Sequence, residues 1–336
     1  MVLSDSSSLF DLSFRGTLLL EEPVLVYSGM YAGQQEPNPF TILADCLSSE
    51  EVVWLVLVAW TAEENSASAV TITAWRDHFL ASHSNHRMIF LANTHAEVVN
   101  LRSLGAEVLL HNQNMFVDRR LFQPIVPKSA KIYDAVYNAQ FLSFKRHELC
   151  TEISNLVLIG YNFENEHFKY VRELLPNVRI ANLDENGSKR WLPQDQVNAI
   201  YNSSHCGLCL SKQEGAMHAS MEYLLAGIPI VTTINQGGRD FYFDGRFVRW
   251  VNDTPSDVSN AVRSLTSEGI DPQFIRSETL RKIDMNIDHF VVSISEYLKI
   301  SASVFKSSLS KVFNDKLIVP KKLSDIIDQL PPRLLS

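Results

Sequence analysis

Residues 205–238 read HCGLCLSKQEGAMHASMEYLLAGIPIVTTINQGG, and this stretch decides the fold. GLCLS predicts a short buried strand, KQEGA a loop, and residues 217–226 a helix that Gly227 and Pro229 end. IPIVTT predicts the next strand, so the stretch is a strand, loop, helix and strand unit. In a parallel sheet, ligands bind at the loop that follows the carboxyl end of a strand.

The loop of this unit has the features of an anion site that also accepts hydroxyl groups. Gly215 lets the backbone approach a ligand closely, and the N–H groups at the helix start carry the positive end of the helix dipole. Glu214 and Glu222 lie eight residues apart, a rotation of about 80° on a helix, so both can point toward one ligand with hydroxyl groups. Alternatively, Glu214 contributes to the helix cap and Glu222 is a solvated helix residue.

The rest of the chain repeats this alternation of strands and helices. Its apolar runs are nearly continuous in Val, Ile and Leu, which predicts strands covered on both faces, as in parallel sheets. Amphipathic helices are predicted at 164–175 and 193–203. The predicted fold class is α/β, with two doubly wound, Rossmann-like halves. The predicted strands are 23–28, 52–60, 86–93, 107–111, 131–138, 156–160, 178–181, 207–211 and 228–233.

The segment LFQPIVPKSA at 121–130 predicts the domain boundary, because it has two prolines and no helical periodicity just before a new strand. We expect an N-terminal domain at 1–127, a second domain at 128–300, and C-terminal helices at 301–336 that pack back on the first domain. Residues 301–336 carry six basic and three acidic side chains. This excess predicts a solvated helical face, with weak peripheral membrane contact as the alternative.

Composition is that of an ordinary globular protein. A length of 336 residues suggests about two domains. With 46% apolar and 20% charged residues, the chain is not disordered, collagen-like or a coiled coil. Its net charge of −8 gives no overall positive field for nucleic acid, so an anionic ligand requires a local site.

We expect a cytoplasmic protein. The N-terminal stretch MVLSDSSSLFDLSFRG lacks the basic region and long apolar run of a signal peptide. The longest apolar run, 52–60, is nine residues, whereas a membrane helix needs about 20. The four cysteines, at 46, 150, 206 and 209, are too few and too unevenly spaced for a disulfide framework.

Cys206 and Cys209 have the C-x-x-C spacing of redox motifs and half zinc sites. Zinc needs about four ligands, and the sequence has no second C-x-x-C. His78 and His83 have a ligand-like spacing but lie in the other half of the chain. We therefore expect the two cysteines to be core residues of a strand and expect no metal site.

A family resemblance covers about thirty residues of the opening stretch. S-x-x-E-G, then Glu222 at E-x7-E spacing, then A-G-I-P-I-V and Gly237-Gly238 resemble the nucleotide-sugar site of family 4 retaining glycosyltransferases. That family has the GT-B fold, so the resemblance implies two Rossmann-like domains facing a central cleft. It also implies transfer of a sugar from a nucleotide-diphosphate sugar to a hydroxyl acceptor, with retention at the anomeric carbon.

The resemblance implies roles for individual residues. Glu214 would face the hydroxyls of the donor sugar, and Glu222 would bind the ribose. The diphosphate would be held by the backbone amides of Gly215, Ala216 and Met217. The family usually has Phe-Gly after the E-G pair, so Ala216-Met217-His218 leaves the shape of the sugar pocket undefined. His218 is either a pocket residue or a first-turn helix residue.

A second stretch, YNAQFLSFKRHEL, is expected to pass from a strand at 131–137 into a helix. At this place the family has an arginine followed five or six residues later by a lysine, which together neutralise the diphosphate. Lys145 matches the lysine, with Arg146 beside it, whereas Gln140 stands where the arginine is expected. The charge clamp is then incomplete unless Arg146 completes it. The alternative is a helix start with ordinary surface charges.

The first half resembles the family weakly. A strand ending at Tyr27-Ser28-Gly29, with Gly33 after it, is a candidate for the glycine loop that faces the donor phosphates. HNQNMFVDRRLFQP, Gln113 included, resembles the N-G-V-D-x-x-x-F-x-P segment that leads into the nucleotide domain. An acceptor-side catalytic histidine is possible, but none is singled out among His78, His83, His86, His95 and His111.

The expected function is therefore that of a retaining glycosyltransferase with mainly electrostatic, metal-independent catalysis and a glycan or lipid-linked acceptor, as in polysaccharide biosynthesis. A non-catalytic subunit that binds a nucleotide sugar or a partner is the alternative, because the arginine is missing and the E-G-A-M loop is altered. Glycoside hydrolysis is disfavoured, since its two carboxylates must flank the bond. A dehydrogenase is disfavoured because no G-x-G-x-x-G follows a strand.

Overall fold

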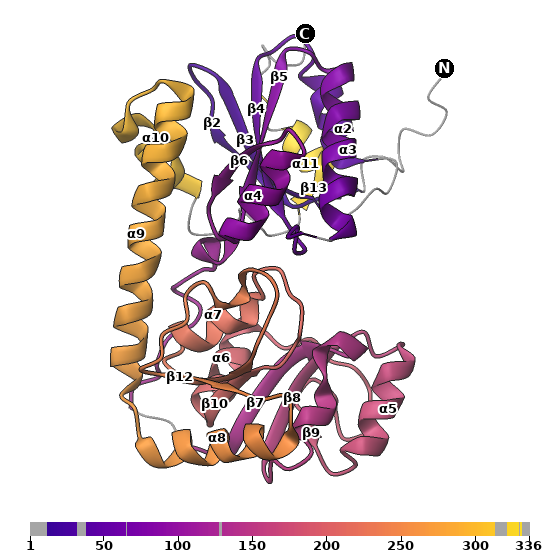
Figure 1. Ribbon diagram of the computed structural model, residues 1–336, viewed down its shortest axis with the longest axis vertical. Helices are drawn as coiled ribbons and strands as arrows, with labels where there is room; N and C mark the ends of the chain where they lie inside the picture. The colour runs from indigo at the N-terminus through magenta and orange to yellow at the C-terminus, as the bar shows by residue number, and fades with distance from the viewer. Residues whose placement is uncertain are drawn as a thin grey trace. The chain divides into compact units, whose positions relative to one another are not determined.

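The computed structural model describes residues 12–31, 38–64, 66–127, 130–312, 321–328 and 330. The chain divides into two compact units. Unit 1 comprises Met1–Phe116 and Asn286–Ser336, and unit 2 comprises Val117–Met285. Each unit has a sheet flanked by helices (Figure 1).

These divisions differ from the expected boundaries after residues 127 and 300. The LFQP segment belongs to unit 2 because its backbone is bound there: Gln123 N donates to Asn198 Oδ1 at 3.1 Å, and Ile125 N donates to Asn202 Oδ1 at 2.9 Å. The second division, between residues 285 and 286, falls within one helix, α9 (Pro272–Leu298). No break in the sequence pattern marks that position.

Unit 1 contains a five-stranded sheet. Strand β2 is antiparallel to β3, and β3 to β6 are parallel. A two-stranded antiparallel sheet joins β1 to β13 near the other end of the chain. In sheet order the strands are β2 (Gly16–Leu20), β3 (Leu25–Tyr31), β4 (Val52–Val58), β5 (His86–Ala92) and β6 (Glu107–Leu110), and the pair is β1 (Ser13–Phe14) with β13 (Lys321–Lys322).

Every residue of β3 and β4 is buried, as expected for parallel strands that are covered on both faces. The core of unit 1 is aromatic, with Trp54 stacked on Tyr27 and in edge contact with Phe40. Leu323 and Ile326 join this core. The described helices of unit 1 are α2 (Pro39–Cys46), α3 (Ala67–Ser82), α4 (His95–Ser103), the 3-10 helix η1 (Gln113–Phe116), the last part of α9, α10 (Ala302–Val312) and α11 (Leu323–Ile327).

Unit 2 has a six-stranded sheet in the order β12-β11-β10-β7-β8-β9, parallel throughout. Its strands are β7 (Tyr133–Gln140), β8 (Leu156–Tyr161), β9 (Arg179–Ile180), β10 (Ser204–Cys209), β11 (Ile230–Thr233) and β12 (Val248–Val251). Its helices are α5 (Glu166–Leu174), α6 (Gln194–Asn202), α7 (His218–Leu225), α8 (Pro255–Glu268) and the first part of α9, with 3-10 helices η2 (Ser143–Lys145), η3 (His147–Cys150) and η4 (Gly238–Asp240).

The α/β fold class is confirmed, and each of the nine predicted strands overlaps an observed one. Strand β12 was not predicted, because its sequence VRWV has no continuous apolar run and it lies at the sheet edge. The helix expected after residue 137 is wrong: β7 runs to Gln140, and short 3-10 turns follow it. Within the described ranges, no helix is long and apolar enough to cross a bilayer.

Gly160 shows how closely unit 2 is packed. A Cβ atom at Gly160 would lie 2.2 Å from Cε2 of Phe141, a fully buried ring. We expect Gly160→Ala to lower the free energy of unfolding by about 1–3 kcal/mol, because the ring must leave its position. Gly245→Ala in the same unit is the control, since no heavy atom lies within 4 Å of the added Cβ. Equal midpoints of the two variants in urea unfolding would contradict this packing.

Candidate functional site

The strand order of unit 2 reverses between β7 and β10. From β7 the chain continues to β8 and β9 on one side, and β10, β11 and β12 follow on the other side. The loops after β7 and β10 therefore leave two adjacent parallel strands in opposite directions. This switch point is where open α/β sheets bind ligands, outside the carboxyl ends of the strands.

A buried ion pair joins these two loops. Lys145, which follows β7, donates from Nζ to Oε1 of Glu214, which follows β10. Each side chain is only 7% exposed. Burial lowers the pKa of Lys145 to about 8, while the adjoining Glu214 carboxylate favours the ammonium form. Ser211 Oγ donates to the same Glu214 oxygen at 3.2 Å.

Arg239 holds the loops around this pair. Its side chain is fully buried, and its Nη1 donates to the Ser211 carbonyl at 2.7 Å. Nη2 donates to the Thr233 carbonyl at 2.6 Å, and Nε to Asp240 Oδ1 at 2.7 Å. The guanidinium thus connects the ends of β10 and β11. Sequence reasoning missed Arg239, although its place directly after Gly237-Gly238 was a signal.

Backbone hydrogen bonds join the same two loops. Glu214 N donates to Gln236 O, and Gln236 N donates to Lys212 O, both at 3.0 Å. The glycine pair follows: Gly237 has a φ of 111°, a value that favours glycine, and Gly238 begins η4. The structure therefore places both glycines beside the Glu214 loop.

The start of α7 lies immediately after this loop. Gly215 and Ala216 are buried, and Met217, the N-cap residue, has a left-handed φ of 45°. The Met217 side chain makes no capping hydrogen bond to this helix, which begins at His218. The amino end of α7 carries the positive end of the helix dipole, which favours an anionic ligand. The strained φ of Met217 is of the kind found at functional sites.

Glu222 lies on α7 in a second polar cluster. The hydroxyl of Tyr201 donates to Glu222 Oε2 at 2.6 Å, and Nδ2 of Asn138 lies 2.6 Å from the same hydroxyl. Burial raises the pKa of Glu222 to about 7, and the Tyr201 hydrogen bond opposes this effect. Tyr201 lies in a helix expected from its periodicity, but nothing in that pattern predicts its bond to Glu222.

Arg146 and Gln140 differ from the expected charge clamp. Arg146 has a left-handed φ of 54°, and its guanidinium pairs with Asp253 at 2.6 Å. It also donates to the Leu210 carbonyl at 2.6 Å and to Thr233 Oγ1 at 2.5 Å. Gln140 is the last residue of β7. Arg146 therefore braces the ends of β10 and β11, and its contact with a diphosphate stays a prediction.

Of the candidates in unit 1, Gly29 and Gln113 lie within the described residues. Gly29 lies inside β3, where a Cβ would meet Phe40 Cζ at 2.5 Å, so its placement in a glycine loop is wrong. Gly33 lies outside the described residues. Gln113 is buried in η1, and its backbone N donates to Asn93 Oδ1 at 3.1 Å.

Two of the histidines serve the core of unit 1. His83 and His86 are buried, and their rings stack with centroids 5.2 Å apart. His83 bonds to Asp45 at 2.9 Å, and the indole N–H of Trp54 donates to His86 at 3.3 Å. Desolvation lowers the pKa of His86, so the neutral ring is favoured. These contacts give both histidines a structural role in the core of unit 1.

The cysteine pair is part of the sheet of unit 2. Cys206 and Cys209 are buried, free thiols on β10, and burial raises the pKa of Cys209 to about 12. In the described residues, no group of three or more His, Cys, Asp or Glu side chains is arranged to hold a metal ion.

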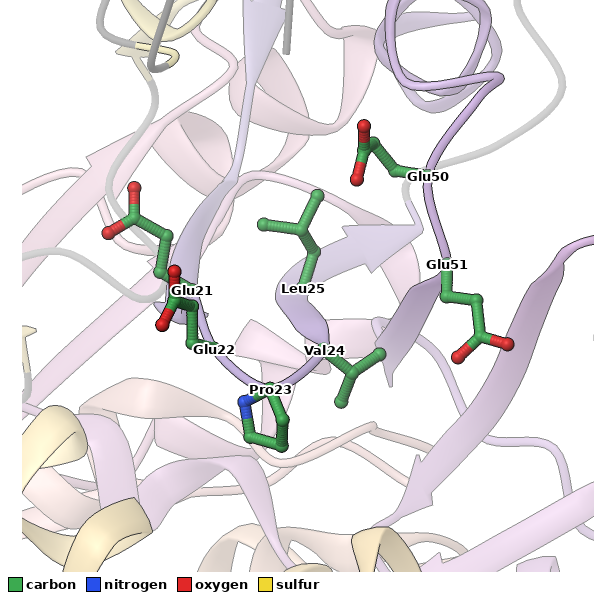
Figure 2. A pocket seen from close by; sticks show the side chains of 7 residues that line it. All are labelled: Glu21, Glu22, Pro23, Val24, Leu25, Glu50 and Glu51. Atoms are coloured by element: carbon green, nitrogen blue, oxygen red, sulfur yellow. The ribbon is translucent and has the colours of Figure 1, made fainter. Parts of the chain in front are cut away.

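A cavity of about 460 Å³ is lined by residues of unit 1. Figure 2 shows its border, where Glu21 and Glu22 lie on one segment and Glu50 and Glu51 on another. These segments precede β3 and β4, at the amino ends of parallel strands. Four carboxylates would repel a diphosphate, so the cavity is no candidate for that ligand.

No family model and no curated protein matches the sequence. Solved structures do match. Anabaena HepE in complex with UDP has a TM-score of 0.55 at 8% identity, covering 82% of each chain. A Rickettsia africae glycosyltransferase has a TM-score of 0.53 at 12% identity, covering 81% of this chain and 85% of the other.

TarM of S. aureus has a TM-score of 0.50 at 13% identity and covers 83% of this chain. The match spans 54% of TarM, so the present chain corresponds to about half of that protein. Identities this low show the fold alone. The chain has the GT-B fold of these glycosyltransferases.

The Lys145–Glu214 pair has a testable energetic signature. Lys145→Met should lower the free energy of unfolding by about 3–5 kcal/mol, because it leaves the Glu214 carboxylate buried and unpaired. The double variant Lys145→Met, Glu214→Leu should regain most of that loss. Urea unfolding measures both effects.

The control is another lysine–glutamate pair of unit 2, Lys189 with Glu164, whose side chains are 51% and 77% exposed. Lys189→Met should change the free energy of unfolding by less than about 1 kcal/mol. If the Lys145 and Lys189 variants were equally stable, the switch-point pair would not be a buried charge pair in solution.

Proposed function

We propose that the chain is a glycosyltransferase that moves a sugar from a nucleotide-diphosphate sugar to a hydroxyl acceptor, with retention at the anomeric carbon. The observation that carries this proposal is the buried Lys145–Glu214 pair on the loops that lead to the start of α7, at the switch point of unit 2. The GT-B fold supports it, as do the neighbours, among which HepE is crystallised with UDP and with UDP and glucose.

In this proposal the donor lies across the loop after β10. The backbone of Gly215, Ala216 and Met217 and the dipole of α7 hold the diphosphate. Glu214 accepts hydrogen bonds from the sugar hydroxyls, and Glu222 accepts them from the ribose. The pocket is completed by His218, Gly237, Gly238 and Gln140.

The chemical step exchanges one bond at the anomeric carbon for another. The bond from this carbon to the diphosphate oxygen breaks, a bond to the acceptor oxygen forms on the same face, and the acceptor proton passes to the diphosphate. Charge gathers on the leaving diphosphate as the bond breaks. The Lys145 ammonium and the N–H groups of α7 stabilise that charge without a metal ion, and Arg146 adds positive charge from its braced position.

The alternative is a non-catalytic subunit that binds a nucleotide sugar or a partner protein. It is supported by the engagement of both cations: Lys145 is neutralised by Glu214, and Arg146 by Asp253. An enzyme should slowly release free nucleoside diphosphate from its donor even without an acceptor. A binding subunit should not release it.

Binding is tested by a thermal-shift panel of UDP, GDP, ADP and CMP. A ligand at 100 times its dissociation constant adds about 2.7 kcal/mol to the free energy of unfolding. One diphosphate should raise the melting temperature clearly more than CMP, because the site is proposed to hold two phosphates. A panel without any shift would contradict the proposed function.

Catalysis is tested at Lys145. With the diphosphate found in the panel as donor nucleotide, Lys145→Ala should reduce kcat about a hundredfold, because it removes one preorganised donor to the leaving group. Lys189→Ala, the exposed lysine variant, should keep wild-type turnover. Wild-type kcat in a folded Lys145→Ala protein would refute the role given to Lys145.

A further inference from the structure

A chain of hydrogen bonds connects Glu222 to the central sheet of unit 2 through Tyr201. The Tyr201 hydroxyl lies 2.6 Å from Glu222 Oε2 and 2.6 Å from Asn138 Nδ2. The three side chains come from α6, α7 and β7, elements separated along the sequence. The Glu222 carboxylate is therefore held by side chains of α6 and β7, and not only by its own helix α7.

The direction of these bonds follows from the donors available. An amide NH2 group only donates, so Asn138 Nδ2 donates to the oxygen of Tyr201. The phenol proton of Tyr201 is then directed to Glu222 Oε2, which accepts it. A hydrogen bond accepted by a carboxylate favours the ionised form of that carboxylate.

Packing fixes the position of the Tyr201 hydroxyl. Its fully buried ring meets Tyr223 edge-on, with centroids 4.9 Å apart, and packs against Phe122 at 5.8 Å. Asn138 is fixed as well, because its backbone N donates to the Tyr223 hydroxyl at 2.7 Å. Tyr223 in turn occupies space that a Cβ at Gly207 would enter, 2.3 Å from that ring.

Glu222 has few charged neighbours in the described part of the chain. The titratable groups that face it are Tyr201 from α6 and Tyr223 from its own helix, and no recorded ion pair includes it. Burial alone would favour the protonated carboxyl, and the Tyr201 bond opposes burial. Within the described residues the recorded bond is to Oε2, and Glu222 is half-buried, so Oε1 can accept a bond from a ligand.

We propose that Tyr201 is a positioning residue of the nucleotide site, whose hydroxyl holds the Glu222 carboxylate in place to accept the ribose hydroxyls. This inference rests on the proposed function, which gives the ribose to Glu222. Without the bond the carboxylate loses its fixed orientation and becomes harder to ionise. Binding of the ribose hydroxyls should then weaken and should require a higher pH.

The test measures the affinity ratio of UDP to 2′-deoxy-UDP by calorimetry, between about pH 6 and pH 8. The ratio isolates the 2′-hydroxyl, because contacts to the base and the diphosphate cancel. In the wild type it should rise with pH through about 7, since the carboxyl with this raised pKa ionises there. Tyr201→Phe, which keeps the ring, should lower the ratio about five- to tenfold at neutral pH and move the rise to higher pH.

The matched control is Tyr133→Phe, which removes the hydroxyl of another buried tyrosine of unit 2, at the start of β7, whose ring packs against the Arg179 guanidinium 5.8 Å from its centroid. It should keep the wild-type ratio and pH dependence. Glu222→Gln should give a low ratio at every pH.

Two outcomes would overturn the role of Tyr201 but leave the ribose role of Glu222 intact. In the first, the two tyrosine variants change the ratio equally. In the second, Tyr201→Phe keeps the wild-type profile while Glu222→Gln lowers the ratio. Absent UDP binding, or a wild-type ratio in Glu222→Gln, would overturn the ribose role of Glu222 and this inference with it.

Discussion

The buried ion pair of Lys145 with Glu214 is the interaction on which the site of unit 2 depends. Two charges removed from water are stable only when they are paired and their remaining bonding capacity is met. Ser211 donates to the same carboxylate, and Arg239 holds Ser211 through its carbonyl. The loops after β7, β10 and β11 are therefore connected through one set of polar contacts.

The strand order makes both polar clusters possible. Lys145 follows β7 and Glu214 follows β10, so the two can meet only because these strands are neighbours. The Glu222 cluster uses the same neighbours, since Asn138 belongs to β7 whereas α6 and α7 precede and follow β10. One cluster pairs two buried charges, and the other joins a carboxylate to two hydrogen-bonding side chains. A net charge of −8 is compatible with the proposed anion site, because the positive end of the α7 dipole and the Lys145 ammonium act locally.

Much of the fold and part of the site were predictable from local patterns. Continuous Val, Ile and Leu runs predicted the strands, and the strand, loop, helix and strand unit around Glu214 is present. Gly29 was assigned to a loop because glycine is typical of turns. In the structure it lies inside a strand, where the rings of Phe14 and Phe40 fill the space that a Cβ atom would need. The contact division falls at residue 117 and not after 127, because Asn198 and Asn202, far along the chain, bind the proline-rich segment.

The sequence by itself determined the α/β alternation, the loop that carries Glu214, and the residue types available to the proposed nucleotide-sugar site, because periodicity and turn chemistry act over a few residues. The tertiary structure decided which of these residues meet. Glu214 lies 69 residues from Lys145, and Tyr201 lies 63 from Asn138. Contacts over such separations are set by strand order and burial, and it is burial that makes each charge and hydroxyl require a partner.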